Sequence, residues 1–416
     1  MSRLPGLLLL LQLLLSCGGG GDSPVASTDQ EPLRIGLLVP FSGAWAPGSA
    51  SWRQSADMAV AEINDSGGVF GRPLSIEAAD TETIPDVAVL GVQSLVERDI
   101  VAVIGAGTSG STIAVAEQVL IPNGILLISP SSTSPRIAEL ADNDLVWRTA
   151  ASDLFQGSLA AQWAWDHEHR TASILYVNNA YGTGLSDTFT KSFERLGGRV
   201  LSRVAYPELA GDDIDDHSYA MVVEQVFEGA PDLVYLITYD QDGAKISVSA
   251  SSHLSADYTP TFLGCDGNTS QAFIDNSAPV VIEGMVGTVP SAPADAVDYR
   301  LFAERYERLF GVTPGSFSES VYDAVYLLAL AMLSGGSSEP AQIARHMQAE
   351  SSGGTRVSPS DLARARSLLA TGGDIDYSGA SGSVDFDDHG DLLSGTYRIW
   401  QVRDGAFTTL QTVDFP

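Results

Sequence analysis

The chain has 416 residues and a formal net charge of −30, with 52 acidic residues against 22 lysines and arginines. A surface this acidic repels nucleic acid and anionic lipid headgroups, so the composition argues against either as a partner. The length is sufficient for two domains, each with its own hydrophobic core.

The first residues predict export. An apolar run at 7–15 is too short to span a bilayer, and a small residue stands just before Cys17. The segment "LLSC" resembles the lipobox of bacterial lipoproteins, which implies that residues 1–16 are a signal peptide and that Cys17 is lipidated. An ordinary signal peptide and a chance apolar start are the alternatives. Residues 17–32 are rich in glycine and serine, which is typical of a flexible tether.

From residue 33 onward, strand and helix patterns alternate. Short apolar runs predict buried strands at 33–40, 74–80, 100–107, 124–130, 172–177, 200–206, 232–238 and 259–264. Helical spacing of apolar residues predicts helices at 56–63, 85–98, 112–119, 152–167, 185–196, 219–227 and 243–252. The pattern then becomes mostly helical, at 297–310, 318–333, 340–350 and 359–369, and closes with antiparallel strands within 382–407.

This regular order predicts an α/β fold in which parallel sheets are covered on both faces by helices. The units are too many for one sheet, and a break at 147–153 divides them into two similar halves, each with a Rossmann-like arrangement. No later segment has 18 consecutive apolar residues, so we expect a soluble body. If Cys17 is lipidated, Cys265 is a free thiol, and we expect it to be buried.

One loop raises the possibility of a nucleotide. Gly105, Gly107 and Gly110 spell G-x-G-x-x-G between a strand and a helix, but no acidic residue follows the next strand to bind a ribose. That strand is followed instead by the hydroxyl-rich "SSTSP" at 131–135. Neither loop contains lysine or arginine, although Arg136 follows the second. Neutral donors and a helix N-terminus suit a single carboxylate better than a pyrophosphate.

Catalytic and metal chemistry are not expected. "GTSGS" at 107–111 lacks the final glycine of a nucleophile elbow, and none of the six histidines has a recognisable catalytic partner. The acidic stretches 212–217 and 385–391 are interpreted as solvated turns, because the second fails the spacing of a calcium loop. We therefore predict no metal, no cofactor and no enzymatic activity.

Several motifs together resemble the type I periplasmic binding proteins, above all the leucine/isoleucine/valine-binding branch. They occur in family order between about residues 33 and 404. The family fold implies two lobes joined by three crossings, here near Arg148, Glu283 and Gly395, with the ligand between the lobes. The motifs are "IGLLVPFSGAW", "AVAEINDSGGVFGRPLSIEAAD", "VAVIGAGTSGST", "LLISPSSTSP", "WRTAASDLFQG", "NAYGTGL", "VYDAVYLLALA" and "DYSGASGSVDFDDHGD".

The resemblance also implies the domain limits and partners. Lobe 1 is expected to comprise 33–148 and 284–394, and lobe 2 to comprise 149–283 and 395–416. The expected protein is a monomeric, membrane-anchored lipoprotein of the periplasm, which binds an amino acid and delivers it to an ABC permease. A sensory module on the same fold, for an amide, urea or another small polar ligand, is the alternative. A hydrolase using Ser109 is a third.

Six residues match family positions that contact the ligand. Ser109 and Thr133 match positions that hold its carboxylate, and the Ser131 carbonyl matches one that accepts from its ammonium. On the other lobe, Tyr181 and Tyr239 match cleft tyrosines, and Asp266 matches the acidic partner of the ammonium. Turn or cap bonds are the alternative roles for Ser131, Thr133 and Asp266.

Two departures from the family pattern leave side-chain specificity open. Gly48 stands where members often carry an aromatic cleft residue, and Trp45 or Trp52 is the candidate to fill that space, unless Trp52 belongs to the core. A cysteine pair found in some relatives is also missing, since Thr108 occupies the second position.

Overall fold

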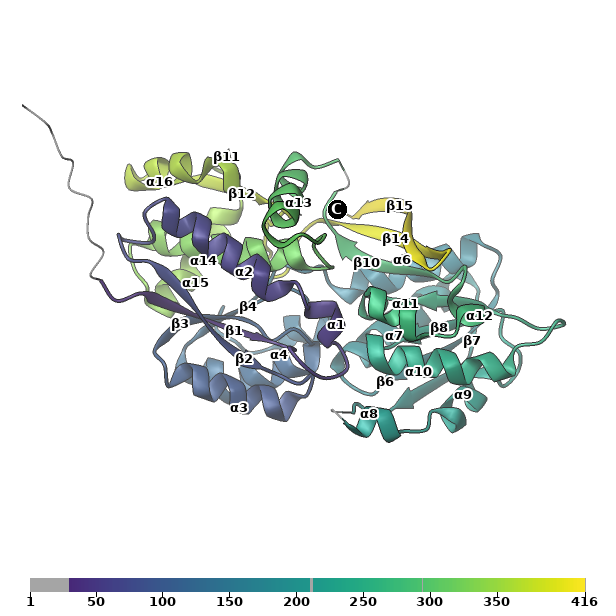
Figure 1. Cartoon of the computed structure of the whole chain (residues 1–416). Helices are drawn as coiled ribbons and strands as arrows, with labels where there is room; N and C mark the ends of the chain where they lie inside the picture. Colours follow the sequence, from purple (N-terminus) through teal and green to yellow (C-terminus); the bar gives the residue numbers. More distant parts are fainter. Residues whose placement is uncertain (1–29, 210–211, 294, 416) are drawn as a thin grey trace, which may run out of the picture.

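The computed structural model describes residues 30–209, 212–293 and 295–415. Two sheets with parallel cores lie side by side, each flanked by helices (Figure 1). The two-lobed α/β architecture predicted from the alternating pattern is therefore confirmed. The predicted signal peptide and Cys17 lie outside the described residues.

The first sheet forms lobe 1 and is parallel throughout, in the order β2-β1-β3-β4-β5. Every residue of β4 is buried, as expected for a central strand covered on both faces by helices. Its strands are β1 (Leu33–Val39), β2 (Leu74–Asp80), β3 (Ile100–Gly105), β4 (Leu126–Ser129) and β5 (Val146–Arg148).

Helices cover both faces of the first sheet (Figure 1). The long α14 is buried from Ser318 to Met332 and packs against α2 and α15, which makes it the central helix of lobe 1. On the other face α3 packs against α4. The helices are α1 (Ala46–Ser49), α2 (Trp52–Asp65), α3 (Pro85–Val96), α4 (Ser109–Val115), α5 (Ile121–Asn123), α13 (Val297–Phe310), α14 (Ser318–Gly335), α15 (Pro340–Ser351) and α16 (Leu362–Ala370). A small sheet holds β11 (Thr355–Val357), β12 (Ile375–Gly379) and β13 (Gly382–Ser383).

The second sheet forms lobe 2, in the order β15-β14-β10-β9-β8-β6-β7. Its core is parallel, and β14 and β15 add an antiparallel edge. The strands are β6 (Thr171–Val177), β7 (Arg199–Tyr206), β8 (Leu233–Ile237), β9 (Thr261–Gly264), β10 (Val286–Ser291), β14 (Gly395–Arg403) and β15 (Ala406–Phe415). The helices are α6 (Asp153–Asp166), α7 (Ala180–Leu196), α8 (Asp212–Asp216), α9 (Ala220–Phe227), α10 (Asp240–Ala250), α11 (Gln271–Asn276) and α12 (Pro279–Ile282).

The second crossing lies later in the chain than predicted. We expected it near Glu283, but β10 pairs with β9 and, over Val286–Ser291, with β14, so this segment belongs to the second sheet. The chain therefore leaves lobe 2 after Ser291, and the expected boundary at residue 284 is wrong. The apolar "GMVGTVP" is a buried strand of lobe 2, not a connection between lobes.

Three helices at the boundary between the lobes begin earlier than their apolar spacing predicts. α4 begins at Ser109 instead of 112, α7 at Ala180 instead of 185, and α10 at Asp240 instead of 243. Their first turns hold small and polar residues, which carry no apolar periodicity. Two of these missed turns, in α4 and α7, supply residues of the candidate site, and Tyr239 of that site lies just before the third.

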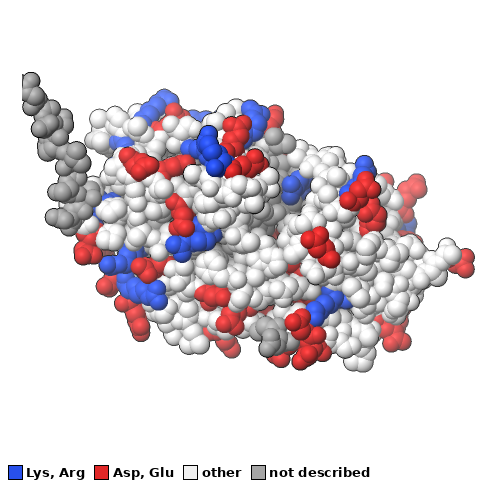
Figure 2. All heavy atoms as spheres, in the orientation of Figure 1, with Lys and Arg blue, Asp and Glu red and all other residues white. Residues whose placement is uncertain are grey.

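The surface carries mainly acidic side chains, as the composition predicts. Acidic side chains are spread over both lobes on the face that Figure 2 shows, and basic ones are fewer. Within the described residues, no single helix is long and apolar enough to cross a membrane. Only α14 and α15 taken together reach that length and hydropathy, and they meet at an angle of 106°.

Candidate functional site

Two loops of lobe 1 form one wall of the cleft between the lobes. The first follows β3 and leads into Ser109, and the second follows β4 and contains Ser131. The Ser131 hydroxyl donates to the Gly107 carbonyl at 2.7 Å, and the Ser134 N–H donates to the Ser109 hydroxyl oxygen at 3.1 Å. The loops are therefore fixed to each other beside the N–H groups at the start of α4.

Arg148, at the end of β5, supports the second loop from behind. It is fully buried, and its Nη1 donates to the Ser132 and Ser134 carbonyls at 3.2 and 2.9 Å. Its Nε donates to Asp391 at 2.6 Å. The sequence suggested only a crossing near Arg148, because its partners lie far away along the chain. Arg136, the basic residue noted beside the loop, is exposed.

The opposite wall comes from lobe 2 and contains a buried carboxylate. Asp266 follows β9 and is 2% exposed. The Tyr181 hydroxyl, on the first turn of α7, donates to its Oδ1 at 2.6 Å, and the Gln156 amide donates to the same atom at 2.8 Å. Asp266 is therefore held in one orientation by side chains from α6 and α7, which is more than a local turn requires.

Three aromatic rings lie next to one another along the cleft. Tyr239 lies 5.7 Å from Tyr181, stacked at 19°, and 5.7 Å from Trp45 between ring centroids. A Cβ added at Gly48 would lie 2.4 Å from the Trp45 Nε1, so the glycine leaves room for this ring. Trp52 is fully buried and donates to a carbonyl at 316, which makes it a core residue. Trp45 is thus the residue that replaces the missing aromatic.

These walls enclose a small cavity. Its volume is about 10 Å³, room for about one water molecule, so a solute can enter only when the lobes open or the lining side chains move apart. Five of the six predicted residues line it; Thr133 does not. The Thr133 carbonyl accepts from the Asp153 N–H at 2.8 Å, which holds the residue against the start of α6. The lining residues are Trp45, Gly107, Thr108, Ser109, Ser131, Tyr181, Tyr239, Asp266 and Gly267.

The lobes touch each other around this cavity. The Ser134 hydroxyl of lobe 1 donates to the Ala180 carbonyl of lobe 2 at 2.9 Å. The Gln241 N–H of lobe 2 donates to the Ala44 carbonyl of lobe 1 at 3.2 Å. The structure is therefore closed over the site, which excludes bulk water from it.

A second buried acid lies near Asp266. Burial raises the pKa of Asp153, at the start of α6, well above its usual range, and the charge of Asp266 raises it further. Burial also raises the pKa of Asp266, while the hydrogen bonds from Tyr181 and Gln156 lower it. Two neighbouring buried carboxyls favour a cation between the lobes. Sequence reasoning missed Asp153 and Gln156, although their spacing of three residues on one helix turn is a usable signal.

The glycine loop is shaped by packing. Gly107 has a φ of 91°, and a Cβ there would lie 2.6 Å from Pro40 Cδ. At Gly110 a Cβ would lie 3.5 Å from Pro85, an ordinary contact, so the third glycine of the motif is not required by space. The residues after β4 include Ser131 and no acid. The geometry thus agrees with the rejection of a nucleotide.

The acidic stretch at 385–391 forms a turn. Asp387 Oδ1 accepts from the N–H groups of His389 and Asp391 at 2.8 and 3.0 Å. Among the described residues, no group of three or more histidine, cysteine, aspartate or glutamate side chains is placed to hold a metal ion. Cys265 is free and buried, as expected for a thiol without a partner.

Known proteins share both the sequence and the fold. The profile described as "Periplasmic binding protein" matches residues 32–406. The chemotactic signal transduction system substrate-binding protein BasB of Halobacterium salinarum is 31% identical, over 91% of this chain and 89% of BasB. The Leu/Ile/Val-binding protein homolog 1 of Brucella suis is 28% identical, over 76% of this chain and 81% of that protein.

Among solved structures, the leucine-binding protein LivK of Thermotoga maritima has a TM-score of 0.76 at 21% identity, over 92% of this chain and 98% of LivK. The substrate-binding protein LivJ of Streptococcus pneumoniae has a TM-score of 0.75 at 19% identity, over 92% and 99%. These structures support the fold, and the profile covers nearly the whole described chain. The chain therefore belongs to the periplasmic binding protein family, as a type I member of the leucine/isoleucine/valine-binding type, a family of solute-binding proteins and not of enzymes.

Proposed function

We propose that this protein binds an amino acid, branched-chain or similar, in the cavity between its lobes and delivers it to the permease of an ABC importer. The observation that carries the proposal is the polarity of the cavity. Lobe 1 contributes hydroxyls and the start of a helix, whereas lobe 2 contributes a buried carboxylate. A zwitterion fits this arrangement, with one charged end on each lobe.

The carboxylate of the ligand would bind to lobe 1. Ser109 and Ser131 offer hydroxyl and backbone groups, and the first N–H groups of α4 point a positive dipole end at the same place. Arg148 holds the second loop without entering the cavity. Neutral donors of this kind stabilise a single carboxylate while allowing its release.

The ammonium would bind to lobe 2. The Asp266 carboxylate is buried and oriented, so it can form a short charge-assisted hydrogen bond with an amine. Asp153 lies beside it, and a bound cation would favour the ionised form of this acid, whose pKa is raised by burial and by Asp266. Tyr181, Tyr239 and Trp45 would enclose the aliphatic part of the ligand. The relatives named for leucine, isoleucine and valine support a ligand with such a side chain.

Calorimetric titration tests this proposal. We expect leucine, isoleucine or valine to bind with one-to-one stoichiometry, and Asp266→Asn to weaken binding by about tenfold or more. The matched control is Asp275→Asn, because Asp275 is an exposed carboxylate of the same lobe whose side chain accepts from Gln271. Failure of every amino acid to bind, or equal affinity in Asp266→Asn, would refute the amino-acid ligand.

A sensory role is the second candidate, and one observation favours it. A relative of 31% identity is named as a substrate-binding protein of chemotactic signal transduction. The same closed cleft would then present a bound amide, urea or other small polar solute to a membrane receptor. Deleting the gene separates the roles: loss of solute uptake supports the importer, and loss of a tactic response with intact uptake supports the sensor.

The location follows from the family and from the first residues. Membership supports an extracytoplasmic protein, and we propose that Cys17 carries the lipid that keeps it at the membrane. The variant Cys17→Ala should then appear in the soluble fraction. We further propose a monomer whose hinge divides the chain into 33–148 with 292–394 and 149–291 with 395–416, following the sheets.

A further inference from the structure

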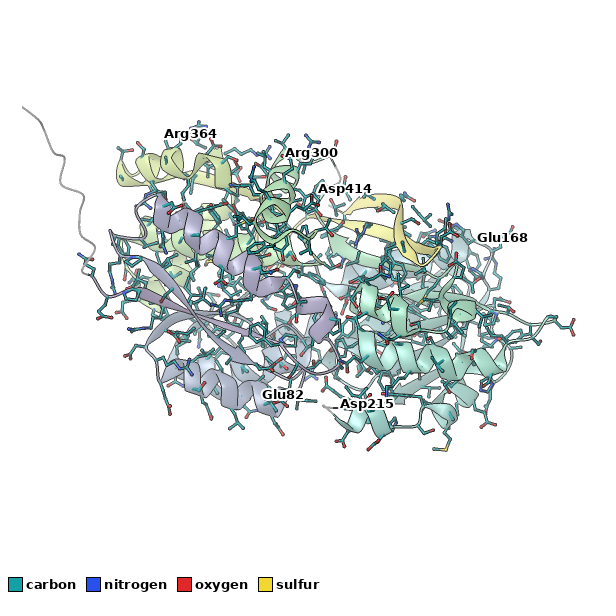
Figure 3. The ribbon with its side chains drawn as sticks, viewed as in Figure 1. Glu82, Glu168, Asp215, Arg300, Arg364 and Asp414 are labelled. Carbon is teal, nitrogen blue, oxygen red and sulfur yellow. The ribbon has the colours of Figure 1, made fainter. Side chains whose placement is uncertain are left out.

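A second polar cavity lies at the hinge, away from the cleft site. α13 and the β14–β15 hairpin lie beside each other at the top of the molecule, and Figure 3 labels Arg300 and Asp414 on them. The cavity between these elements holds about 690 Å³ of empty space, counted with its opening to solvent. It shares no lining residue with the cleft cavity. Its polar lining includes Ser291, Tyr299, Glu319, Arg398, Thr409 and Thr412.

Two opposite charges line this cavity without meeting. Glu319, on the first turn of α14, is 6% exposed, and Arg398 lies on β14. Among the described residues, no side chain hydrogen-bonds or ion-pairs with either of them. The Glu319 carboxylate accepts from the Ala292 backbone N–H, and Arg398 is half-buried, with its Nε buried and without a partner. Buried charges are normally paired, because removing them from water is costly. Glu319 has backbone donors but no cationic partner, and Arg398 has no anionic one, so each can still receive one end of a ligand with two charges.

Neighbouring groups extend the same chemistry. The Ser291 hydroxyl is also buried without a partner among the described residues, and Tyr299 and two threonines complete a polar wall. Burial raises the pKa of Glu319 to about 7, although Arg398 lowers it, so a cationic partner would favour its ionised form. Arg398 in turn offers a planar set of donors suited to a carboxylate.

We propose that this cavity is a second binding site, for a small zwitterion with a primary amine and a carboxylate. The carboxylate binds Arg398 and the ammonium binds Glu319. Both lobes contribute residues to this site. Glu319 belongs to lobe 1 and Arg398 to lobe 2, and Ser291 ends the strand before the second crossing. An occupant therefore joins the lobes at the hinge. The proposal does not depend on which ligand fills the cleft.

Equilibrium dialysis of the full chain tests this, with labelled glycine, β-alanine and γ-aminobutyrate as probes. We expect saturable binding of at least one probe that Glu319→Gln and Arg398→Gln each weaken by about tenfold or more. Butyrate and butylamine, each with one of the two charges, should bind about tenfold more weakly than γ-aminobutyrate.

Matched controls distinguish this site from the cleft. Arg403→Gln removes an exposed charge from the same strand, and Glu307→Gln does so on α13; neither should change probe binding. Asp266→Asn should leave probe binding intact, even if it abolishes binding in the cleft. No saturable binding, binding that survives both hinge variants, or binding lost only in Asp266→Asn would each overturn the proposal. Glu319→Gln decides the outcome if Arg398→Gln does not fold.

Discussion

Two buried aspartates, one in each lobe, differ in what surrounds them. Asp323 on α14 accepts from the Tyr377 hydroxyl at 2.8 Å, the Ala380 N–H at 2.9 Å and both donors of Ser381, at 2.7 and 2.5 Å. Asp153 on α6 has two buried oxygens without a well-aligned hydrogen bond from the described residues, and the Thr133 hydroxyl is the side-chain donor beside them. Both side chains are fully buried.

The difference shows that donors, more than burial, decide how far the pKa of a buried acid rises. Burial raises the pKa of Asp323 to about 6, while hydrogen bonds from Ser381, Ala380 and Tyr377 limit the rise. The pKa of Asp153 is raised well above its usual range. A carboxylate supplied with donors can stay ionised and stabilise the fold, whereas one with few donors is held in its neutral form until a cation approaches.

The strongest test of this comparison is Asp323→Asn. The amide presents an N–H₂ group to donors that need an acceptor, so we expect the free energy of unfolding to fall by about 3 kcal/mol or more. Urea denaturation measures this, with the exposed Asp257→Asn as control. A loss as small as that of the control would mean that the four hydrogen bonds do not stabilise the native state.

The pH dependence of stability should reveal the buried acids whose carboxyl oxygens are not all hydrogen-bonded. Asp240 is one of them: its Oδ1 accepts from the Ser270 N–H at 3.3 Å, but its Oδ2 is buried without a partner among the described residues. Burial raises its pKa from 3.8 to about 7, so the folded state keeps a proton that the unfolded chain has already released. The stability that this bound proton contributes is fully present below the unfolded pKa of 3.8 and is lost as the pH rises through the folded pKa of about 7.

We therefore expect the unfolding free energy of the empty protein to fall between these two pH values. Asp240→Asn should reduce the fall by about 2 kcal/mol, because the amide does not titrate. Urea denaturation across the pH range gives both slopes. Identical slopes in the two proteins would show that Asp240 titrates normally.

Removing one donor from Asp323 should have a smaller effect. Ser381→Ala deletes the hydroxyl bond but keeps the backbone N–H bond, so we expect a loss of about 1 kcal/mol in unfolding free energy. The matched control is Ser383→Ala, whose hydroxyl is on the surface and donates to Asp385. A stability equal to that of the control would contradict the importance of this bond.

Asp153→Asn should have the smallest effect on stability. It replaces a buried acid, whose raised pKa favours the neutral form, by a neutral amide that keeps an oxygen for the Thr133 hydroxyl, so we expect a change within about 0.5 kcal/mol, or a slight gain. Amine binding in the cleft should weaken at the same time. Destabilisation as large as that of Asp323→Asn would remove the distinction between the two acids.

The sequence was sufficient for the parts of the fold that depend on local pattern. Alternating apolar runs predicted both sheets, and the strand-end loops identified Ser109 and Ser131. It failed where contacts are distant: Gln156 lies 110 residues from Asp266, and Arg148 lies 243 residues from Asp391. No local spacing reveals such pairs, so the supporting residues of the site emerged only with the structure.

The choice between Trp45 and Trp52 was undecidable for a related reason. Both lie near the same turn, and only packing separates a ring that fills the cleft from one that fills the core. The strand β10 was misassigned because a short apolar run has the same appearance whether it joins a sheet or crosses between lobes.

The position of Trp45 also provides an optical signal. The chain has six tryptophans, and among the residues lining the cleft cavity Trp45 is the one indole. Its ring lies 5.7 Å from Tyr239, so a solute entering the cavity alters the polarity and packing around a single fluorophore. Emission at wavelengths selective for indole should therefore follow ligand entry in real time, without an attached dye.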